Sequence, residues 1–292
     1  MPSGLNNSKR SSPRSKALAE LVTSVWSHYA LARRNFPWRH PALKLRADGT
    51  LDPYRIVVSE VMLQQTQAGA RTIEKYRAFI QRFPNITALA AASLRDVYAL
   101  WQGLGYNRRA KALREAAILI ESEYDGKFPD TVEGLKELPG VGPYTASAVY
   151  VFAYNKPAVL IETNLRTVFI HHLFKGREMV SDAELLPVIK KVLDHERPRQ
   201  WYSALMDYGA MLKKQHGNVS RKSAHYVRQS PFKGSDRELR GKLLKALLAK
   251  PHQSAVSLGR SISEGKERVE TQLQALVGEG FVVRQGRRYK LA

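Results

Sequence analysis

Apolar positions along most of the chain recur at the spacing of an amphipathic helix. The first such stretch begins near Ala17, and the pattern returns repeatedly up to Tyr154 with short polar or Gly/Pro breaks between stretches. Strand-like alternation is absent until the last dozen residues. We therefore expect an all-α body, whose further helices cover residues 56–67, 72–83, 93–101, 109–123, 132–138 and 143–154.

The last third of the chain predicts a separate module. Residues 211–235 contain six Lys or Arg and no acid, which is typical of a basic connecting segment. Two helices, a turn at 255–259 between them and a hairpin around Gln285-Gly286 follow, in the order of a winged helix. We expect the following parts: a flexible basic arm (1–16), a terminal helical lobe (17–52 and 165–212), a six-helix lobe (53–164), the connecting segment (213–235) and a winged-helix module (236–292), whose helices cover 237–248 and 266–278.

Charge and composition narrow the function classes. The 292 residues hold 47 Lys plus Arg against 26 Asp plus Glu, a net charge of +21 that favours a polyanionic partner such as nucleic acid. The chain has no cysteine, which excludes disulfides, thiolate zinc sites, Cys-ligated iron–sulfur clusters and cysteine nucleophiles. Its longest apolar run, residues 146–154, is about half of the roughly 20 residues that a membrane span needs. We expect a monomer with neither a membrane partner nor a metal site.

The segment L-P-G-V-G-P-Y-T-A at 138–146 lies between two apolar helices. Gly140 and Gly142 are expected in a tight hairpin that needs positive φ and close backbone approach, and Pro143 suits a first helical turn. Backbone amides of the hairpin and of the helix N-terminus would bind a phosphate without reading sequence. An ordinary helix–turn–helix corner is the alternative.

Two carboxylates stand at positions suited to acid catalysis and charge stabilisation. Glu60 borders the apolar run Val61–Leu63, and burial beside apolar groups favours the protonated form that a general acid needs. Glu162 ends an apolar approach just before Thr163 or Asn164, either of which could cap a helix whose positive end favours an ionised carboxylate. Such a pair, converging on one cavity, suits cleavage through an oxocarbenium-like centre.

Several motifs together resemble a known family. S-E-V-M-L-Q-Q-T, W-Q-G-L-G-Y, L-P-G-V-G-P-Y-T and the Glu162 region closely resemble the helix–hairpin–helix glycosylases of the endonuclease III superfamily, and within it the MutY-type adenine DNA glycosylases. F-P-W-R and M-D-Y-G-A also match, so the resemblance covers roughly residues 17–212. It implies a helix–hairpin–helix glycosylase fold of two helical lobes and removal of a flipped-out adenine opposite guanine or 8-oxoguanine in double-stranded DNA. It also implies a cytoplasmic protein, nucleoid-associated if the source is bacterial. The first four motifs stand at residues 59–66, 101–106, 138–145 and 162–164, and the last two at 36–39 and 206–210.

The resemblance assigns catalytic roles to three residues. Glu60 matches the acid that protonates the leaving adenine and then assists water, and Glu162 matches a carboxylate that stabilises the cationic sugar. Tyr144 matches a tyrosine that lines the site; bifunctional relatives carry a Schiff-base lysine there, so a hydrolase without lyase activity is implied.

The resemblance and the basic segment also predict the DNA contacts. Gln64, Gln65 and Tyr106 match residues that wedge into the duplex and contact the opposite base while the target is extruded. The further expected DNA contacts are Arg39, Gly140, Gly142, Lys213 and Lys214.

Three departures from the family pattern leave alternatives open. Glu162 replaces the usual aspartate, L-K-K-Q-H at 212–216 stands where a four-cysteine iron–sulfur loop is expected, and the predicted winged helix replaces the domain that recognises 8-oxoguanine. We expect no cofactor, with a monovalent cation held by the hairpin carbonyls as the one exception. A mismatch thymine or uracil DNA glycosylase and a non-catalytic damaged-DNA-binding protein are the alternative functions.

Overall fold

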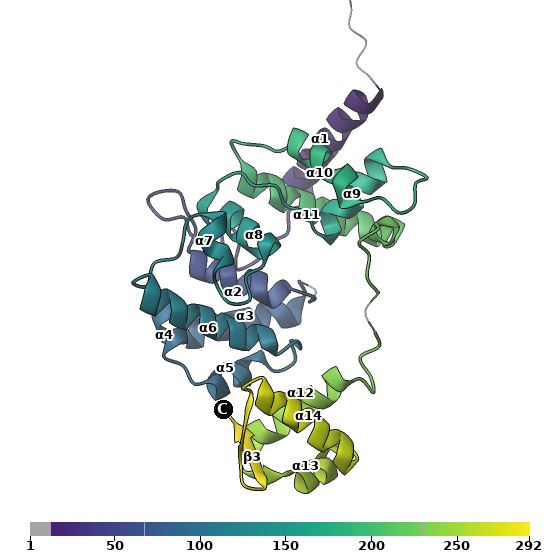
Figure 1. Ribbon diagram of the computed structural model, residues 1–292. Coiled ribbons are helices and arrows are strands. Elements are labelled where there is room, and N and C mark those ends of the chain that lie inside the picture. The colour runs from purple at the N-terminus through teal and green to yellow at the C-terminus, as the bar shows by residue number, and fades with distance from the viewer. Residues whose placement is uncertain (1–12, 67, 229) are drawn as a thin grey trace, which may run out of the picture. The chain divides into compact units, whose positions relative to one another are not determined.

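A computed structural model describes residues 13–66, 68–228 and 230–292. Figure 1 shows a helical chain with one small sheet near its end. The elements, in chain order, are α1 (Pro13–Ala32), α2 (Pro53–Leu63), α3 (Ala70–Arg82), α4 (Ile86–Ala90), α5 (Leu94–Trp101), α6 (Arg108–Glu123), α7 (Val132–Lys136), α8 (Pro143–Tyr154), α9 (Thr163–Leu173), α10 (Asp182–Lys191), α11 (Pro198–His216), the 3-10 helix η1 (Val219–Lys222), α12 (Asp236–Ala249), β1 (Gln253–Ser254), α13 (Ala255–Ile262), α14 (Lys266–Gly278), β2 (Val282–Gln285) and β3 (Arg288–Leu291).

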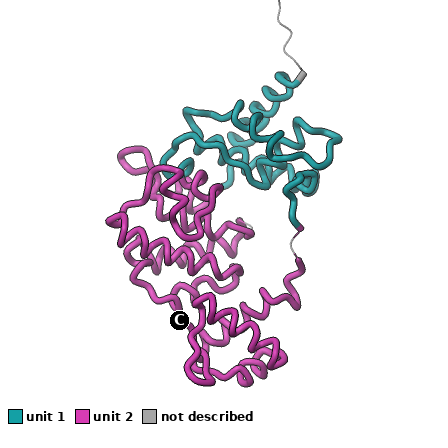
Figure 2. The backbone as a smooth tube through the Cα atoms, viewed as in Figure 1, with its two compact units in different colours: residues 1–35, 150–227 teal, residues 36–149, 228–292 magenta. Residues whose placement is uncertain are grey.

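The chain divides into two compact units, coloured separately in Figure 2. Unit 1 takes residues up to 35 and 150–227, and unit 2 takes 36–149 and 228–292. These limits differ from the expected parts. Residues 36–52 belong to unit 2 rather than to the terminal lobe, 150–164 belong to unit 1, and the C-terminal module groups with unit 2.

Unit 1 is a helical lobe in which α11 packs on α1 and α9. Trp201 of α11 is buried, and its ring centroid lies 5.5 Å from that of Trp26 in α1. The buried carboxylate of Asp207 accepts hydrogen bonds from Arg34 Nε at 2.7 Å and from the Arg34 backbone at 2.9 Å, which anchors the end of α1 on α11. Most of the expected basic arm at 1–16 lies outside the described residues, and residues 13–16 form the first turn of α1 rather than a flexible segment.

The first part of unit 2 is built around aromatic side chains from α3 and α5. Trp101 and Phe79 are fully buried with ring centroids 6.1 Å apart, and the Trp101 indole donates to the Gly105 carbonyl at 3.1 Å. Tyr76 packs edge-on against Trp38, with a centroid distance of 5.1 Å. These contacts hold the segment after α5, which carries Tyr106, on a rigid base.

Residues 236–292 form a winged helix. Helices α12, α13 and α14 accompany a three-stranded antiparallel sheet of order β1-β3-β2, whose first strand lies between α12 and α13 in the chain. Strand β2 pairs with β3 in the register Gln285↔Arg288. The expected hairpin and the helices at 237–248 and 266–278 are confirmed, with α12 one residue longer at each end. The expected turn at 255–259 is wrong, because Ser254 caps α13 through its side chain and the helix buries Leu258.

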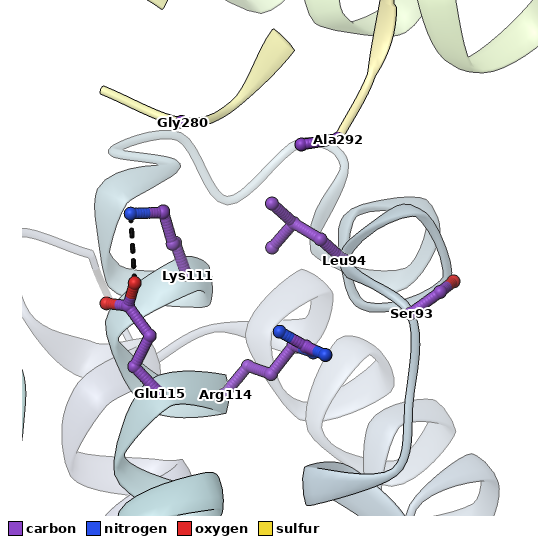
Figure 3. A pocket seen from close by; sticks show the side chains of 7 residues that line it. All are labelled: Ser93, Leu94, Lys111, Arg114, Glu115, Gly280 and Ala292. Atoms are coloured by element: carbon purple, nitrogen blue, oxygen red, sulfur yellow. Dashed lines mark ion pairs between the residues drawn. The ribbon is translucent and has the colours of Figure 1, made fainter. Parts of the chain in front are cut away.

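The winged helix docks on α5 and α6. Glu279, at the end of α14, accepts paired hydrogen bonds from Arg108 of α6 and from Arg240 of α12. Phe281 is buried with its ring centroid 5.6 Å from that of Tyr98 in α5. A pocket of about 350 Å³ lies along this junction (Figure 3), and it is lined by Ser93, Leu94, Lys111, Arg114, Glu115, Gly280 and Ala292.

The helix ends differ from the sequence expectation where capping decides them. The expected helix at 56–67 starts earlier, because the Asp52 side chain accepts a hydrogen bond from Tyr54 N and Pro53 occupies the first turn. It ends at Leu63, four residues sooner than expected. Among the described residues, no helix combines the length and the hydropathy required to cross a bilayer.

Candidate functional site

The expected hairpin between two helices lies between α7 and α8. Gly140 has φ +77°, and a Cβ built on it would lie 2.7 Å from the Cβ of Ala112, so both a left-handed backbone and close approach require glycine here. The Val141 amide donates to the Leu138 carbonyl at 3.0 Å, and Pro143 is the first residue of α8 as predicted. The expectation of positive φ and close packing is wrong for Gly142, whose built Cβ would meet nothing within 4 Å.

Glu60 lies in the last turn of α2. Its neighbours Ser59 and Val61 are buried, while Glu60 itself is half-buried. The Glu60 carbonyl accepts from the Gln64 amide at 3.2 Å, which closes the helix. Glu60 therefore stands beside buried residues of the unit 2 core, and its role as a general acid stays a prediction.

The end of α2 is joined to the start of α8. The Gln64 side-chain amide donates to the Thr145 hydroxyl at 3.1 Å, and Thr145 is buried in the first turn of α8. Tyr144, the preceding residue, is half-buried. Within unit 2, the segment carrying Gln64 therefore meets the helix that carries Tyr144.

Arg109 ties together the two segments that follow α2 and α5. Its guanidinium is largely buried, and among the described residues its acceptors are six backbone carbonyls and the Thr66 hydroxyl. Burial lowers the pKa of Arg109 to about 10, which still leaves it protonated at neutral pH. One side chain thus holds both segments in fixed positions. The six carbonyls belong to Val61, Met62, Gln64, Leu104, Gly105 and Tyr106.

The two segments held by Arg109 present Gln65 and Tyr106 in left-handed backbone conformations. Gln65 has φ +56° and is exposed, and Tyr106 has φ +47° with 38% of its surface exposed. Non-glycine residues rarely adopt this region, and such strain is retained where the surroundings fix it. The predicted wedge residues are therefore presented at the surface of unit 2 on rigid supports.

Glu162 is itself the N-cap of α9, a position that the sequence had suggested for Thr163 or Asn164. Its Oε1 accepts from the Asn164 and Leu165 backbone amides at 2.9 and 3.0 Å, and its Oε2 accepts from the Asn164 side-chain amide at 3.1 Å. Thr163 is instead the first residue of α9, because the Glu162 side chain folds back and accepts from the free amides at the helix start that an N-cap side chain satisfies.

Burial raises the pKa of the Glu162 carboxyl above its ordinary value, while the hydrogen bonds from Asn164 and Leu165 and the charge of Arg166 oppose that rise. Asn164 and Leu165 donate hydrogen bonds to the carboxylate and Arg166 adds a positive charge, so these groups favour the ionised form that burial disfavours. The approach to Glu162 is fixed by the buried Tyr202 hydroxyl, which accepts from Leu160 N at 3.0 Å and donates to Ala158 O at 2.8 Å.

Comparison with known proteins identifies the family. Residues 58–188 match the family described as HhH-GPD superfamily base excision DNA repair protein. Over 243 residues the chain is 35% identical to the adenine DNA glycosylase of Mycolicibacterium smegmatis, covering 76% of this chain and 78% of that protein. The chain belongs to the adenine DNA glycosylases of the HhH-GPD superfamily.

Other similar proteins agree with this family. The adenine DNA glycosylase of Mus musculus is 36% identical over 192 residues, which cover 64% of this chain and 37% of the mouse protein. A solved thermostable thymine-DNA glycosylase superposes with a TM-score of 0.57 at 26% identity, covering 72% of this chain and 97% of its own. A trapped endonuclease III–DNA intermediate, at 19% identity and a TM-score of 0.55, shares the fold.

The residues after Met211 do not fit the iron–sulfur cluster expected from the resemblance. The chain has no cysteine, and in the part that the structure describes no three His, Asp or Glu residues gather as metal ligands. In this glycosylase α11 instead continues to His216, and η1 follows. The backbone of Val180 pairs with that of Lys222 and Ala224, at 2.9 Å in both bonds, so ordinary hydrogen bonds hold the segment.

The remaining site predictions are distributed over the two units. Lys213 and Lys214 are exposed in the last turn of α11, and Arg39 lies with its guanidinium 5.1 Å from the Phe36 ring centroid. Glu60 belongs to unit 2 and Glu162 to unit 1, and their convergence stays a prediction. The cation at the hairpin also stays a prediction.

Sequence reasoning missed Arg109. In the run Tyr106-Asn107-Arg108-Arg109, two consecutive arginines at a helix start are typical of a solvated, phosphate-facing surface. A usable signal was present: Arg109 stands four residues after Gly105, so on α6 its side chain can turn back over the G-L-G-Y segment.

Proposed function

We propose that this adenine DNA glycosylase is monofunctional and hydrolyses the bond between deoxyribose and an adenine mispaired with guanine or 8-oxoguanine. The carrying observation is the 35% identity to an adenine DNA glycosylase over three quarters of the chain, together with Glu60 at the edge of the unit 2 core. The net charge of +21 suits a double-stranded DNA substrate.

In the proposed reaction Glu60 donates a proton to the extruded adenine as the bond from its ring nitrogen to the sugar C1′ breaks. The bonding electrons leave with the base, and the sugar becomes cationic. The Glu162 carboxylate stabilises that positive charge. Water adds to C1′ and loses a proton to Glu60, which leaves free adenine, an abasic site and the original enzyme.

We propose that the enzyme lacks lyase activity because residue 144 is a tyrosine. Tyr144 carries a phenol, and the formation of a Schiff base with the opened sugar requires an amine. Gln64, Gln65 and Tyr106 are proposed to enter the duplex as the base leaves, because the arginine-bound segments present two of them in strained, accessible conformations.

The test is an excision assay on labelled duplexes that contain A:G, A:8-oxoguanine, A:C, T:G and U:G pairs. Alkali should cleave the A:G and A:8-oxoguanine products strongly, and samples without alkali should stay intact. Glu60→Gln should abolish excision while retaining DNA binding. Release of thymine or uracil without release of adenine would instead indicate a mismatch thymine/uracil DNA glycosylase. Binding without release of any base would indicate a non-catalytic damaged-DNA-binding protein.

A further inference from the structure

The side chain of Tyr106 is held by the C-terminal module. The first-turn residue Arg237 of α12 donates from Nη1 to the Tyr106 hydroxyl at 2.5 Å, and its guanidinium lies 5.3 Å from the Tyr106 ring centroid. From Nη2 the same guanidinium donates to Ser230 O at 2.7 Å and to the Ser230 hydroxyl at 3.2 Å. Arg237 is therefore anchored on one side and contacts Tyr106 on the other.

The backbone of Tyr106 is held separately. Arg109 donates to the Tyr106 carbonyl at 3.4 Å and to the Gly105 carbonyl at 3.1 Å, and both residues belong to the short segment between α5 and α6. Arg109 thus fixes where the tyrosine stands. The Arg109 guanidinium also lies 5.6 Å from the Tyr106 ring centroid, and Arg237 adds a second ring contact and a hydrogen bond to the hydroxyl, which restrict rotation of the ring further.

Docking of the winged helix determines where Arg237 lies. Arg108 pairs with Glu279 at 2.7 Å, Tyr98 packs on Phe281, and Arg95 donates to the Leu248 carbonyl at 2.6 Å. Arg95 and Tyr98 belong to α5 and Arg108 to α6, so the module is held by the two helices that flank the Tyr106 segment. The module is therefore fixed at the base of that segment, with α12 beside its tip.

We propose that Arg237 is a positioning residue for Tyr106, through which the C-terminal module sets how strongly the enzyme discriminates the base opposite adenine. The inference rests on the proposed function, in which Tyr106 enters the duplex. A side chain that must fill the space beside the opposite base performs best in one orientation, because an unrestrained ring loses conformational entropy on insertion. A charged guanidinium bound to both the ring face and the hydroxyl supplies that restraint.

The experiment uses the full chain with Arg237→Ala, Arg237→Lys, Tyr106→Phe and the double variant Arg237→Ala/Tyr106→Phe. Arg260→Ala is the matched control, since it removes one exposed arginine of α13 in the same module. Single-turnover rates are measured opposite guanine, 8-oxoguanine and cytosine. A 2-aminopurine opposite the target reports unstacking on binding, and this readout does not require catalysis.

Arg237→Ala is expected to lower the ratio of rates opposite 8-oxoguanine and cytosine by roughly three- to tenfold, the range for one accessible charge-assisted hydrogen bond. Tyr106→Phe should cause a loss of similar size, and the double variant should lose little more, because both changes remove the same contact. Arg237→Lys should recover part of the ratio. The 2-aminopurine signal should fall in parallel, and Arg260→Ala should match the wild type.

Three outcomes would overturn the proposal: a wild-type ratio in Arg237→Ala, additive losses in the double variant, or an equal loss in Arg260→Ala. A lower thermal unfolding midpoint in Arg237→Ala with an unchanged ratio of rates would also count against the proposal, because it would assign Arg237 a purely structural role. Failure of the proposed function looks different, because wild-type enzyme would then release no adenine.

Discussion

Gly209 and Asn164 meet backbone to backbone where α11 crosses the start of α9. A Cβ built on Gly209 would lie 2.4 Å from the Asn164 carbonyl oxygen and 2.8 Å from the Asn164 Cβ. Asn164 in turn holds both oxygens of the Glu162 carboxyl group. The glycine of the M-D-Y-G-A motif is therefore a condition for the geometry of Glu162.

We expect Gly209→Ala to displace Asn164 and with it Glu162. The free energy of unfolding should fall by roughly 1–3 kcal/mol, since the added methyl group meets backbone that cannot easily move. The rate of adenine excision should fall by about a hundredfold for a displacement on the order of 1 Å. Single-turnover excision and urea unfolding measure the two effects. Gly241→Ala in α12 is the control, because its built Cβ meets nothing within 4 Å, and it should be neutral or slightly stabilising.

Replacement of Glu162 by glutamine should separate charge from shape. Glu162→Gln keeps the length but removes the charge and directs a donor at either the backbone amides or the Asn164 side chain, so we expect at least a hundredfold loss of excision. Glu162→Asp keeps both the charge and a favourable helix cap, and should retain activity within about tenfold of the wild type. Equal activity in wild type and Glu162→Gln would exclude the proposed role of the carboxylate.

The acid side of the pH–rate profile should also report Glu162. Burial raises the pKa of this carboxyl, so the ionised fraction falls as the pH drops through a value above the ordinary glutamate value of 4.5. Activity that depends on the carboxylate should then fall at a higher pH than an exposed glutamate would give. The profile is measured as single-turnover rate against pH. An acid limb that lies in the same place in Glu162→Gln would assign it to another group.

Loss of Arg109 should loosen both wedge segments at once. Arg109→Met leaves several buried carbonyls without their donor, and we expect the free energy of unfolding to fall by roughly 2–4 kcal/mol. Hydrogen exchange should increase at residues 64–66 and 104–106 together. Arg77→Met, at an exposed position of α3, is the control for loss of a positive charge. Faster exchange in only one of the two segments would contradict the shared anchor.

The docking of the winged helix should weaken in acid. The hydrogen bonds from Arg108, and then those from Arg240, lower the pKa of Glu279 to about 2, so its contribution is complete above the ordinary value of 4.5 and is lost as the pH falls toward 2. Glu279→Gln should remove this dependence and cost about 1 kcal/mol at neutral pH, given the partial exposure of the pair. Calorimetry from pH 7 to pH 3 measures it. Glu270→Gln, in a looser pair with Lys266, should leave the slope unchanged.

The sequence predicted the helical body, the hairpin glycine Gly140 and the family, because apolar periodicity and the L-P-G-V-G pattern are local signals. It placed Glu162 at a helix start but not at the cap, since Thr and Asn are the commoner caps and the choice depends on how α9 packs on α11. The sequence predicts a turn where α13 forms, because this helix is short and its serines and glycine interrupt the apolar spacing typical of a helix. The position of Arg109 on α6 indicates that its side chain can reach the G-L-G-Y segment, but its acceptors more than 40 residues away are brought to it only by the tertiary fold.

The division of unit 2 into residues 36–149 and 228–292 imposes an order on biosynthesis. During translation α5 and α6 leave the ribosome long before α12 and α14. The contacts of Tyr98 with Phe281 and of Tyr106 with Arg237 therefore cannot form until nearly the whole chain has been synthesised. A nascent or truncated polypeptide would possess the hairpin and Glu60 yet lack the restraint on its wedge. Full selectivity for the mispair is thus expected to be acquired last.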